Sequence, residues 1–227
     1  MTTYAPSSIE SGKLPTILSL RPKPTERVLV VGQTGSGKTV LMENLLKSRE
    51  YVVVHDAKHA QAIGKWRGYR VITRARDLAK LVPDRDKRII YRPSENEVQD
   101  LEVQNAFFRW IFHRRNTTVY VDETFMLQVN NVWPRYHFLC VTQGRDRRVE
   151  VWSGMQRPTL VPLVTLTEAE HVFMFRLQYD EDRMRMEGVT GLNADELSPR
   201  SLPKHVFWYV QTGEEPIGPL KLDLEGG

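Results

Sequence analysis

The stretch GQTGSGKT, residues 32–39, matches the phosphate-binding loop pattern G-x-x-x-x-G-K-[ST] at every fixed position. Four apolar residues, 28–31, precede this loop, and an apolar-periodic run from Val40 to Leu46 follows it. Strand, loop and helix in this order are the context in which the pattern binds nucleotide. We therefore predict a nucleotide-binding loop, or P-loop, between the first strand and the first helix.

Each residue type in the P-loop has a physical role. Glycines let the backbone bend so that successive N–H groups point at phosphate oxygens, and the positive end of the helix dipole near Gly37 adds to the attraction. The Lys38 ammonium is expected to reach the β- and γ-phosphates of ATP, and the Thr39 hydroxyl to hold Mg²⁺. Nucleotide contacts are assigned to Gly32, Gln33, Thr34, Gly35, Ser36, Gly37, Lys38, Thr39 and Val40.

Length and composition suit one α/β domain with extensions. The 227 residues are 41% apolar and 26% charged, with a net charge of +4, which is ordinary for a globular protein and permits a nucleic-acid partner. No apolar run approaches 18 residues, so we expect no transmembrane segment. The single cysteine, Cys140, cannot form an intrachain disulfide, and no metal-ligand cluster is visible. These features favour a cytoplasmic setting.

The P-loop and the apolar runs predict a P-loop NTPase fold, an α/β fold with a mostly parallel central sheet flanked by helices. Residues 1–26, rich in proline, are predicted to form an extended arm, 27–212 the ATPase domain and 213–227 a tail. Strands are predicted at 28–31, 51–55, 69–73, 88–91, 118–121, 149–154, 171–177 and 205–211, and helices at 38–47, 76–81, 97–115 and 134–148.

Two adjacent carboxylates, Asp122 and Glu123, follow the apolar run 118–121. An acidic side chain at the end of the strand that neighbours the P-loop strand can hold the Mg²⁺ shell, and a following glutamate can orient and deprotonate the attacking water. We assign Asp122 to the metal and Glu123 to the water. The alternative is a strand that merely ends in solvent with acidic side chains.

Gln156 follows the next predicted strand, 149–154. A polar side chain at the end of a strand beside the acidic one is well placed to sense the γ-phosphate and the attacking water. We therefore assign Gln156 to catalysis, with a turn or capping residue as the alternative.

Missing motifs narrow the class of P-loop protein. The chain has no Asn-Lys-x-Asp motif, which argues against a GTPase, and no Leu-Ser-Gly-Gly-Gln motif, which argues against a transporter-type ATPase. A small-molecule kinase transfers phosphate to a substrate hydroxyl, so a water-activating base would only waste ATP. The pair Asp122 and Glu123 therefore predicts hydrolysis.

Three further motifs accompany the P-loop and the carboxylates: Asp-x-Lys at 56–58, a Gly-Arg helix at 144–148 and Gln-Arg-Pro at 156–158. Together, over residues 27–187, they resemble the HerA/FtsK superfamily of DNA-pumping ATPases. The small chain without a recognisable accessory domain is most similar to the genome-packaging ATPases of double-stranded DNA viruses. That resemblance implies a fold of the RecA-like (ASCE) type and a motor that uses ATP and Mg²⁺ to move duplex DNA into a preformed capsid.

The resemblance also implies partners and further site residues. It implies a homo-oligomeric ring, a hexamer or pentamer, around double-stranded DNA in the host cytoplasm, attached to a capsid vertex or portal protein. An arginine from the neighbouring subunit would complete each ATP site, and the candidates are Arg145, Arg148 and Arg183. DNA contacts to phosphates are suggested for Lys58, Lys65 and Arg67, with solvent-facing charge as the alternative for each.

Other functions remain open from the sequence. One is a different DNA or assembly motor of the conjugation or filamentous-virus extrusion type, which normally needs a membrane tether. Another is an ATP-dependent switch that hydrolyses slowly and never moves DNA, and a weaker one is a nucleotide kinase. Stimulation of turnover by long duplex DNA would separate a pump from a switch.

Overall fold

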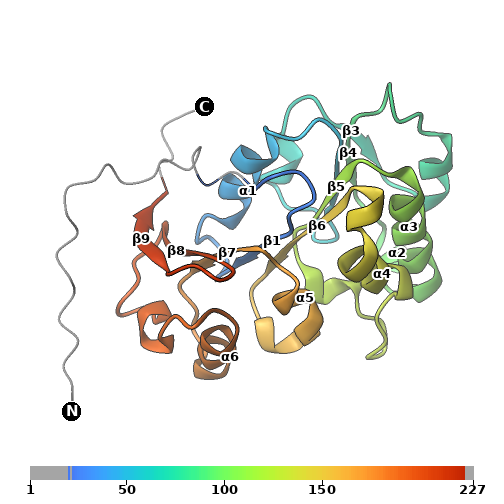
Figure 1. The fold of residues 1–227 in the computed structure, drawn as a ribbon. Helices are drawn as coiled ribbons and strands as arrows, with labels where there is room; N and C mark the ends of the chain where they lie inside the picture. Colours follow the sequence, from blue (N-terminus) through green and yellow to red (C-terminus); the bar gives the residue numbers. More distant parts are fainter. Residues whose placement is uncertain (1–19, 21, 223–227) are drawn as a thin grey trace, which may run out of the picture.

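The computed structural model describes Leu20 and residues 22–222, and Figure 1 shows the chain as a ribbon. Residues 1–19, 21 and 223–227 lie outside the described part, and they include most of the predicted arm and the end of the predicted tail. No helix within the described residues has the length and apolar character that crossing a membrane requires.

One sheet of nine strands runs through the described part of the chain, in the spatial order β3-β4-β2-β5-β6-β1-β7-β8-β9. All pairs from β3 to β7 are parallel, whereas β8 and β9 are added antiparallel. The predicted α/β fold with a mostly parallel sheet is confirmed. The strands are β1 (Val28–Val31), β2 (Val52–His55), β3 (Arg70–Ile72), β4 (Arg88–Tyr91), β5 (Thr117–Val121), β6 (Val149–Met155), β7 (His171–Phe175), β8 (Val206–Gln211) and β9 (Ile217–Lys221).

Helices cover both faces of the sheet, and α1 lies on the opposite face from α3, α4, α5 and α6 (Figure 1). Side chains of β1 alternate between the faces. Val28 and Val30 join the core cluster that contains α1, whereas Leu29 and Val31 join the cluster that contains α5 and α6. Burial on both faces explains the almost unbroken apolar sequence of the central strands. The helices are α1 (Lys38–Leu46), α2 (Glu95–Val98), α3 (Leu101–Arg114), α4 (Arg135–Gln143), α5 (Leu163–Thr167) and α6 (Asp180–Thr190).

β6 lies between β1 and β5, so the prediction that the acidic strand neighbours the P-loop strand is wrong. Val31 of β1 pairs with Met155 of β6, and Val121 of β5 pairs with Ser153 of β6. Chain order does not fix the order of parallel strands, because a long crossover connection can pass over a neighbouring position. As a result, Gln156 comes between the P-loop and the two carboxylates.

Several segments differ from their predicted structure. The helix predicted for 76–81 is the 3₁₀ segment Ala75–Lys80, and the helix predicted for 97–115 is divided between α2 and α3. The helix predicted for 134–148 ends at Gln143 and is followed by a 3₁₀ segment, Arg145–Arg147, while the charged run after β7 forms α6. Residues Ile217–Lys221, in the predicted tail, form β9. Gly218 and Pro219 disguise β9 in the sequence because both are poor strand formers, yet an edge strand tolerates them.

Residues 22–26, at the end of the predicted arm, lie across the amino edge of the sheet. The Thr25 N–H donates to a carboxylate oxygen of Glu150 in β6 (2.7 Å), and the carbonyl oxygen of Glu26 accepts from Nε1 of Trp152 (3.1 Å). The Glu26 carboxylate lies 2.8 Å from Nε2 of His171 in β7. This part of the arm is therefore packed on the domain.

Candidate ATP site

The P-loop, Asp122, Glu123 and Gln156 gather at the carboxyl edge of the sheet. β1, β5 and β6 are parallel and end at this edge, so the P-loop after β1, the carboxylates after β5 and Gln156 after β6 come together. β2 and β7 end at this edge too, and the segments that follow them bring Lys58 and Gln178 to the site. Sequence reasoning assigned neither residue to ATP hydrolysis.

The P-loop turns sharply into α1. Gly37 is the N-cap of α1 with φ 112°, where a side chain would be strained, and an added Cβ would lie 2.7 Å from Cδ2 of Leu222. The first turn of α1 carries no acidic residue, so its partial positive charge is available to an anion. The buried hydroxyl of Ser36 has no hydrogen-bond partner within the described residues. A nucleotide phosphate fits both features.

Lys38 is buried inside the P-loop. Its Nζ donates to the carbonyl oxygens of Gly32 (2.7 Å) and Gln33 (3.0 Å). Burial lowers the pKa of Lys38 to about 8, and the carboxylates of Glu123 and Asp122 oppose that shift. The ammonium is therefore charged at neutral pH and is held where the loop surrounds a phosphate.

Oxygen atoms suited to Mg²⁺ lie beside the P-loop. Oγ1 of Thr39 is 3.5 Å from Oδ1 of Asp122, and the hydroxyl of Tyr120 donates to the same Oδ1 (2.7 Å). Burial raises the pKa of Asp122, against the hydrogen bond from Tyr120 and the charge of Lys38. No group of three or more His, Cys, Asp or Glu side chains in the described ranges is arranged to hold a metal. Thr39 and Asp122 still fit Mg²⁺, which commonly takes few protein oxygens and completes its shell with phosphates and waters.

Glu123 is fully engaged by neighbouring groups. Its side chain is 8% exposed, and Oε2 accepts hydrogen bonds from Nζ of Lys58 (2.7 Å) and from Nε2 of Gln156 (2.8 Å). Oε1 accepts from the N–H of Gln156 (3.2 Å). Both oxygens are thus held at the carboxyl edge, and one of them is ion-paired with a lysine.

Gln156 links this carboxylate to the P-loop. Its Oε1 accepts a hydrogen bond from Oγ1 of Thr34 (2.9 Å) while its amide nitrogen donates to Glu123. On the other side of the loop, Nε2 of Gln33 donates to Oε1 of Gln178, after β7 (3.0 Å). Gln33 and Thr34, at variable positions of the P-loop motif, therefore contact residues that follow β7 and β6, the two strands on either side of β1.

Arg157 fixes the backbone that carries Gln156. Its Nε lies 2.5 Å from Oδ2 of Asp182 in α6, and its guanidinium stacks 4.1 Å from the ring centre of Tyr179. Asp182 is buried and also accepts from the N–H and hydroxyl of Thr159 (3.1 and 2.6 Å). The Gln-Arg-Pro motif is thereby attached to the start of α6.

The three predicted arginine fingers lie in different places. Arg183, on α6, donates to the carbonyl oxygens of Leu177 (3.2 Å) and Gln178 (3.0 Å), at the same edge as its own P-loop. Arg145 is ion-paired with Glu170, and Arg148 is exposed just before β6, so both lie at the amino edge. Within one copy of the chain, neither of these two reaches the P-loop.

The three predicted DNA contacts are also separated. Lys58 is at the carboxyl edge with Glu123, whereas the exposed Lys65 and Arg67 lie further along the connection that returns the chain to the start of β3. The position of Lys58 assigns it first to the ATP site. Its signal in the sequence was the Asp-x-Lys motif itself, which did not specify a partner.

Asp56 completes the segment after β2. This fully buried carboxylate contacts Nε and Nη2 of Arg92, each at 2.8 Å, and accepts from the N–H of Ala60 (2.8 Å). It therefore holds the backbone on either side of Lys58. Nothing local in the sequence indicates Arg92, because it follows a different strand.

Comparisons with known proteins agree with this geometry. No protein-family model matches the chain. The chain is 28% identical over 182 residues to the DNA packaging ATPase P9 of Enterobacteria phage PRD1, a match that covers 78% of this chain and 75% of P9. Its fold is similar to that of the genome packaging NTPase B204 of Sulfolobus turreted icosahedral virus 2 in complex with AMPPCP: the TM-score is 0.65 at 13% identity, with 88% of this chain and 100% of B204 covered.

A second group of structures shares the fold over part of a longer chain. The cytoplasmic domain of the type VII secretion ATPase EccC of Thermomonospora curvata matches with a TM-score of 0.63 at 16% identity, covering 89% of this chain and 26% of that one. The predicted resemblance to viral genome-packaging ATPases is confirmed by the sequence match to P9 and the fold match to B204.

Proposed function

We propose that this chain is an ATP-hydrolysing motor that packages the double-stranded DNA of a virus into its capsid. The observation that carries the proposal is the meeting of Lys38, Thr39, Asp122, Glu123 and Gln156 at one edge of the sheet. This set provides phosphate binding, a metal site and a base for water. The sequence similarity to P9, a DNA packaging ATPase, directs that chemistry toward packaging.

The chain's own groups can perform each part of the hydrolysis. The P-loop N–H groups and Lys38 orient the β- and γ-phosphates, and Thr39 and Asp122 would hold Mg²⁺, which neutralises phosphate charge when bound. Glu123 takes a proton from water as the water oxygen bonds to the γ-phosphorus and the bond from that phosphorus to the β-phosphate oxygen breaks. Gln156, between Glu123 and Thr34, holds the base in register with the P-loop.

We further propose that the motor works as a hexameric or pentameric ring around duplex DNA in the host cytoplasm, docked at a capsid vertex. A ring explains why Arg145 and Arg148 lie at the edge opposite their own P-loop, since a neighbouring copy can present that edge to the site. An arginine supplied in this way raises the rate by about 10³ to 10⁵ in known cases.

Steady-state ATP turnover with and without long duplex DNA tests the proposal. Wild type at high protein concentration and low salt should be stimulated several-fold by duplex. The Glu123→Gln variant should bind ATP normally but lose about 100-fold or more in turnover, as expected for removal of a general base. If turnover ignores DNA where size analysis shows a closed ring, the pump is rejected in favour of an ATP-dependent switch.

A further inference from the structure

A basic hollow lies at the amino edge of the sheet, at the other end of the strands from the ATP site. It has a volume of about 330 Å³ and is formed where the chain enters β2, β3 and β4. Five cationic side chains line it: Arg49, Arg70, Arg85, Lys87 and Arg88. The acidic lining residues are Glu50 and Asp86. The hydrolysis of ATP uses none of these residues.

One buried carboxylate positions two of the arginines. Oδ1 of Asp86 contacts Nη1 of Arg70 (2.7 Å), Oδ2 contacts Nη2 of Arg85 (3.2 Å), and the N–H of Val82 donates to Oδ2 (2.9 Å). These hydrogen bonds, that of Val82 first, lower the pKa of Asp86 to about 2, so the carboxylate stays ionised. Two guanidinium groups share one negative charge, and both remain accessible, with 48% and 66% of their side chains exposed.

The groups that accept hydrogen bonds from Arg88 include no carboxylate that would neutralise its charge. Its guanidinium donates to the hydroxyl of Tyr69 (2.8 Å) and to the carbonyl oxygens of Leu46 (3.0 Å) and Arg49 (2.5 Å). Neutral carbonyl and hydroxyl acceptors fix its direction and leave its charge in place. Lys87 and Arg49 are ion-paired with Glu50 and Glu150, so the surplus positive charge of the hollow comes from Arg70, Arg85 and Arg88. Ordered guanidinium groups of this kind bind phosphate through paired N–H groups.

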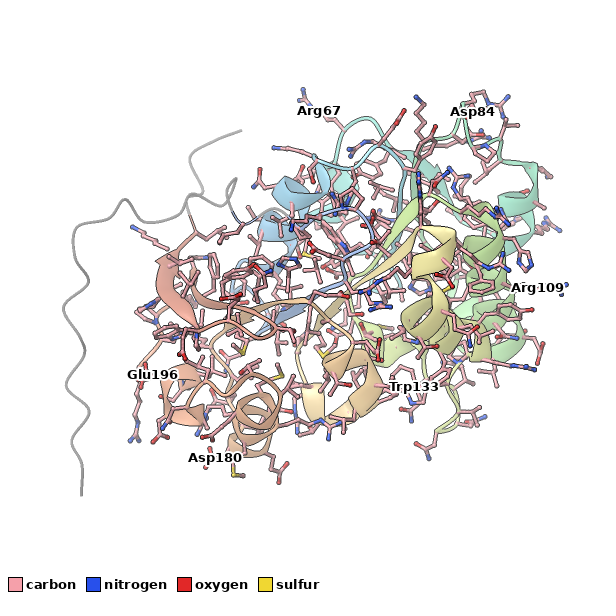
Figure 2. The ribbon with its side chains drawn as sticks, viewed as in Figure 1. Arg67, Asp84, Arg109, Trp133, Asp180 and Glu196 are labelled. Atoms are coloured by element: carbon pink, nitrogen blue, oxygen red, sulfur yellow. The ribbon has the colours of Figure 1, made fainter. Side chains whose placement is uncertain are left out.

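The chain leading into the hollow adds more positive charge. Residues 59–70, which return the chain to the start of β3, contain no Asp or Glu and three Lys or Arg, namely Lys65, Arg67 and Arg70. Arg67 is exposed and precedes Gly68, a lining residue of the hollow. In Figure 2, Arg67 lies at the top of the molecule, as does Asp84, whereas Arg109 lies at the side.

We infer that this hollow binds the phosphate backbone of duplex DNA, with Arg70, Arg85 and Arg88 as the phosphate contacts. The inference rests on the proposed function, which supplies duplex DNA as the partner. Contacts to phosphates carry no sequence information, as a motor that packages a whole genome requires. DNA would then be held at one edge of the sheet and ATP hydrolysed at the other.

Binding of a fluorescent duplex at several salt concentrations tests the inference. The double variant Arg70→Gln/Arg85→Gln should raise the Kd at least tenfold at low salt. It should also reduce the slope of log K against log salt concentration by about two, close to one for each lost phosphate contact. Its ATP turnover without DNA should equal that of wild type.

The matched control is Arg109→Gln/Arg135→Gln, which removes the same charge from exposed positions on α3 and α4. A second variant, Arg70→Lys/Arg85→Lys, keeps the charge but not the paired N–H groups and should bind with intermediate affinity. Equal affinities and salt slopes for the hollow variants and the control would overturn the inference. If wild type itself neither binds duplex nor responds to it, the proposed function fails instead.

Discussion

Glu123 is the proposed base for the attacking water, and its ion pair with Lys58 occupies one of its two carboxylate oxygens. A carboxylate whose Oε2 accepts from an ammonium at 2.7 Å is poorly placed to take a proton from water. The Lys58 side chain is 40% exposed, so it can move away from Glu123 while the hydrogen bonds from Gln156 remain. Lys58 therefore restrains the proposed base as long as the ion pair is formed.

We expect Lys58→Gln to raise ATP turnover in the absence of DNA several-fold, because Oε2 of Glu123 is freed. The measurement is kcat and KM without DNA, with DNA affinity recorded in parallel. Lys58→Arg retains the ion pair and should behave as wild type. A Lys58→Gln variant with unchanged kcat and unchanged ATP affinity would contradict this role.

Lys38 gives the site a dependence on pH. With a pKa of about 8 it is charged below pH 8 and loses its charge as the pH rises above 8, while a bound phosphate stabilises the charged form. ATP binding should therefore take up about half a proton at pH 8 and almost none at pH 6.5. Calorimetry in two buffers of different ionisation enthalpy measures this uptake. Lys38→Arg stays charged throughout, and equal uptake in both proteins would rule out Lys38 as the source.

Among single residues, the sequence predicts those members of the candidate site that belong to contiguous motifs. The P-loop residues, Asp122, Glu123 and Gln156 follow from local patterns, and the structure brings them together. The contact of Lys58 with Glu123 joins residues that are distant in the chain, so no local pattern shows it. The same is true of Arg157 and Asp182.

Among the elements, β9 has an effect on the P-loop that its sequence hides. Leu222, just after β9, is buried beside Gly37, and its N–H donates to the carbonyl oxygen of His205 (2.7 Å). This places an apolar side chain under the first turn of α1. The end of the sheet therefore supports the loop expected to hold the phosphates.

Leu222→Ala should lower the free energy of unfolding by about 2 to 5 kcal/mol, the usual cost of a cavity in a packed core. It should also weaken ATP binding, because α1 loses its support beside Gly37. Thermal unfolding and ATP titration measure the two effects. Ile217→Ala, at a partly exposed position of β9, should change the free energy of unfolding by less than about 0.5 kcal/mol. Equal effects of Leu222→Ala and Ile217→Ala on stability and ATP affinity would show that Leu222 does not support the P-loop.

Elements with strong periodicity were predictable, and the order of strands was not. Apolar runs such as 28–31 indicate the buried parallel strands, and the carboxyl ends of these strands locate the candidate site. That β6 separates β1 from β5 depends on which face and direction each crossover takes, and residues within a strand do not encode this. β9 was missed because Gly218 and Pro219 lack strand propensity.

For the whole molecule, the two edges of the sheet divide the work of the proposed motor. Of the three predicted arginine fingers, Arg145 is ion-paired with Glu170, and Arg183 donates to backbone carbonyl oxygens before α6. Arg148 is exposed and has no ion pair within the described residues. Arg148 is therefore the candidate most available to an ATP site on another copy.

We expect Arg148→Ala to lower turnover by about 10³-fold without weakening ATP binding. Mixing it with Glu123→Gln should restore part of the activity, because a mixed ring contains sites with both an intact base and an intact arginine. Turnover per subunit should also rise with protein concentration in wild type. A mixture as inactive as its components, with rings present, would place the arginine elsewhere.

The support that Leu222 gives to Gly37 also has a consequence for biosynthesis. The P-loop leaves the ribosome early, but the side chain beneath it is translated only after β9. A nascent chain that has made the first eight strands would still lack this part of its nucleotide pocket. Competence to bind ATP should therefore arise late in translation, once Leu222 is in place beside Gly37.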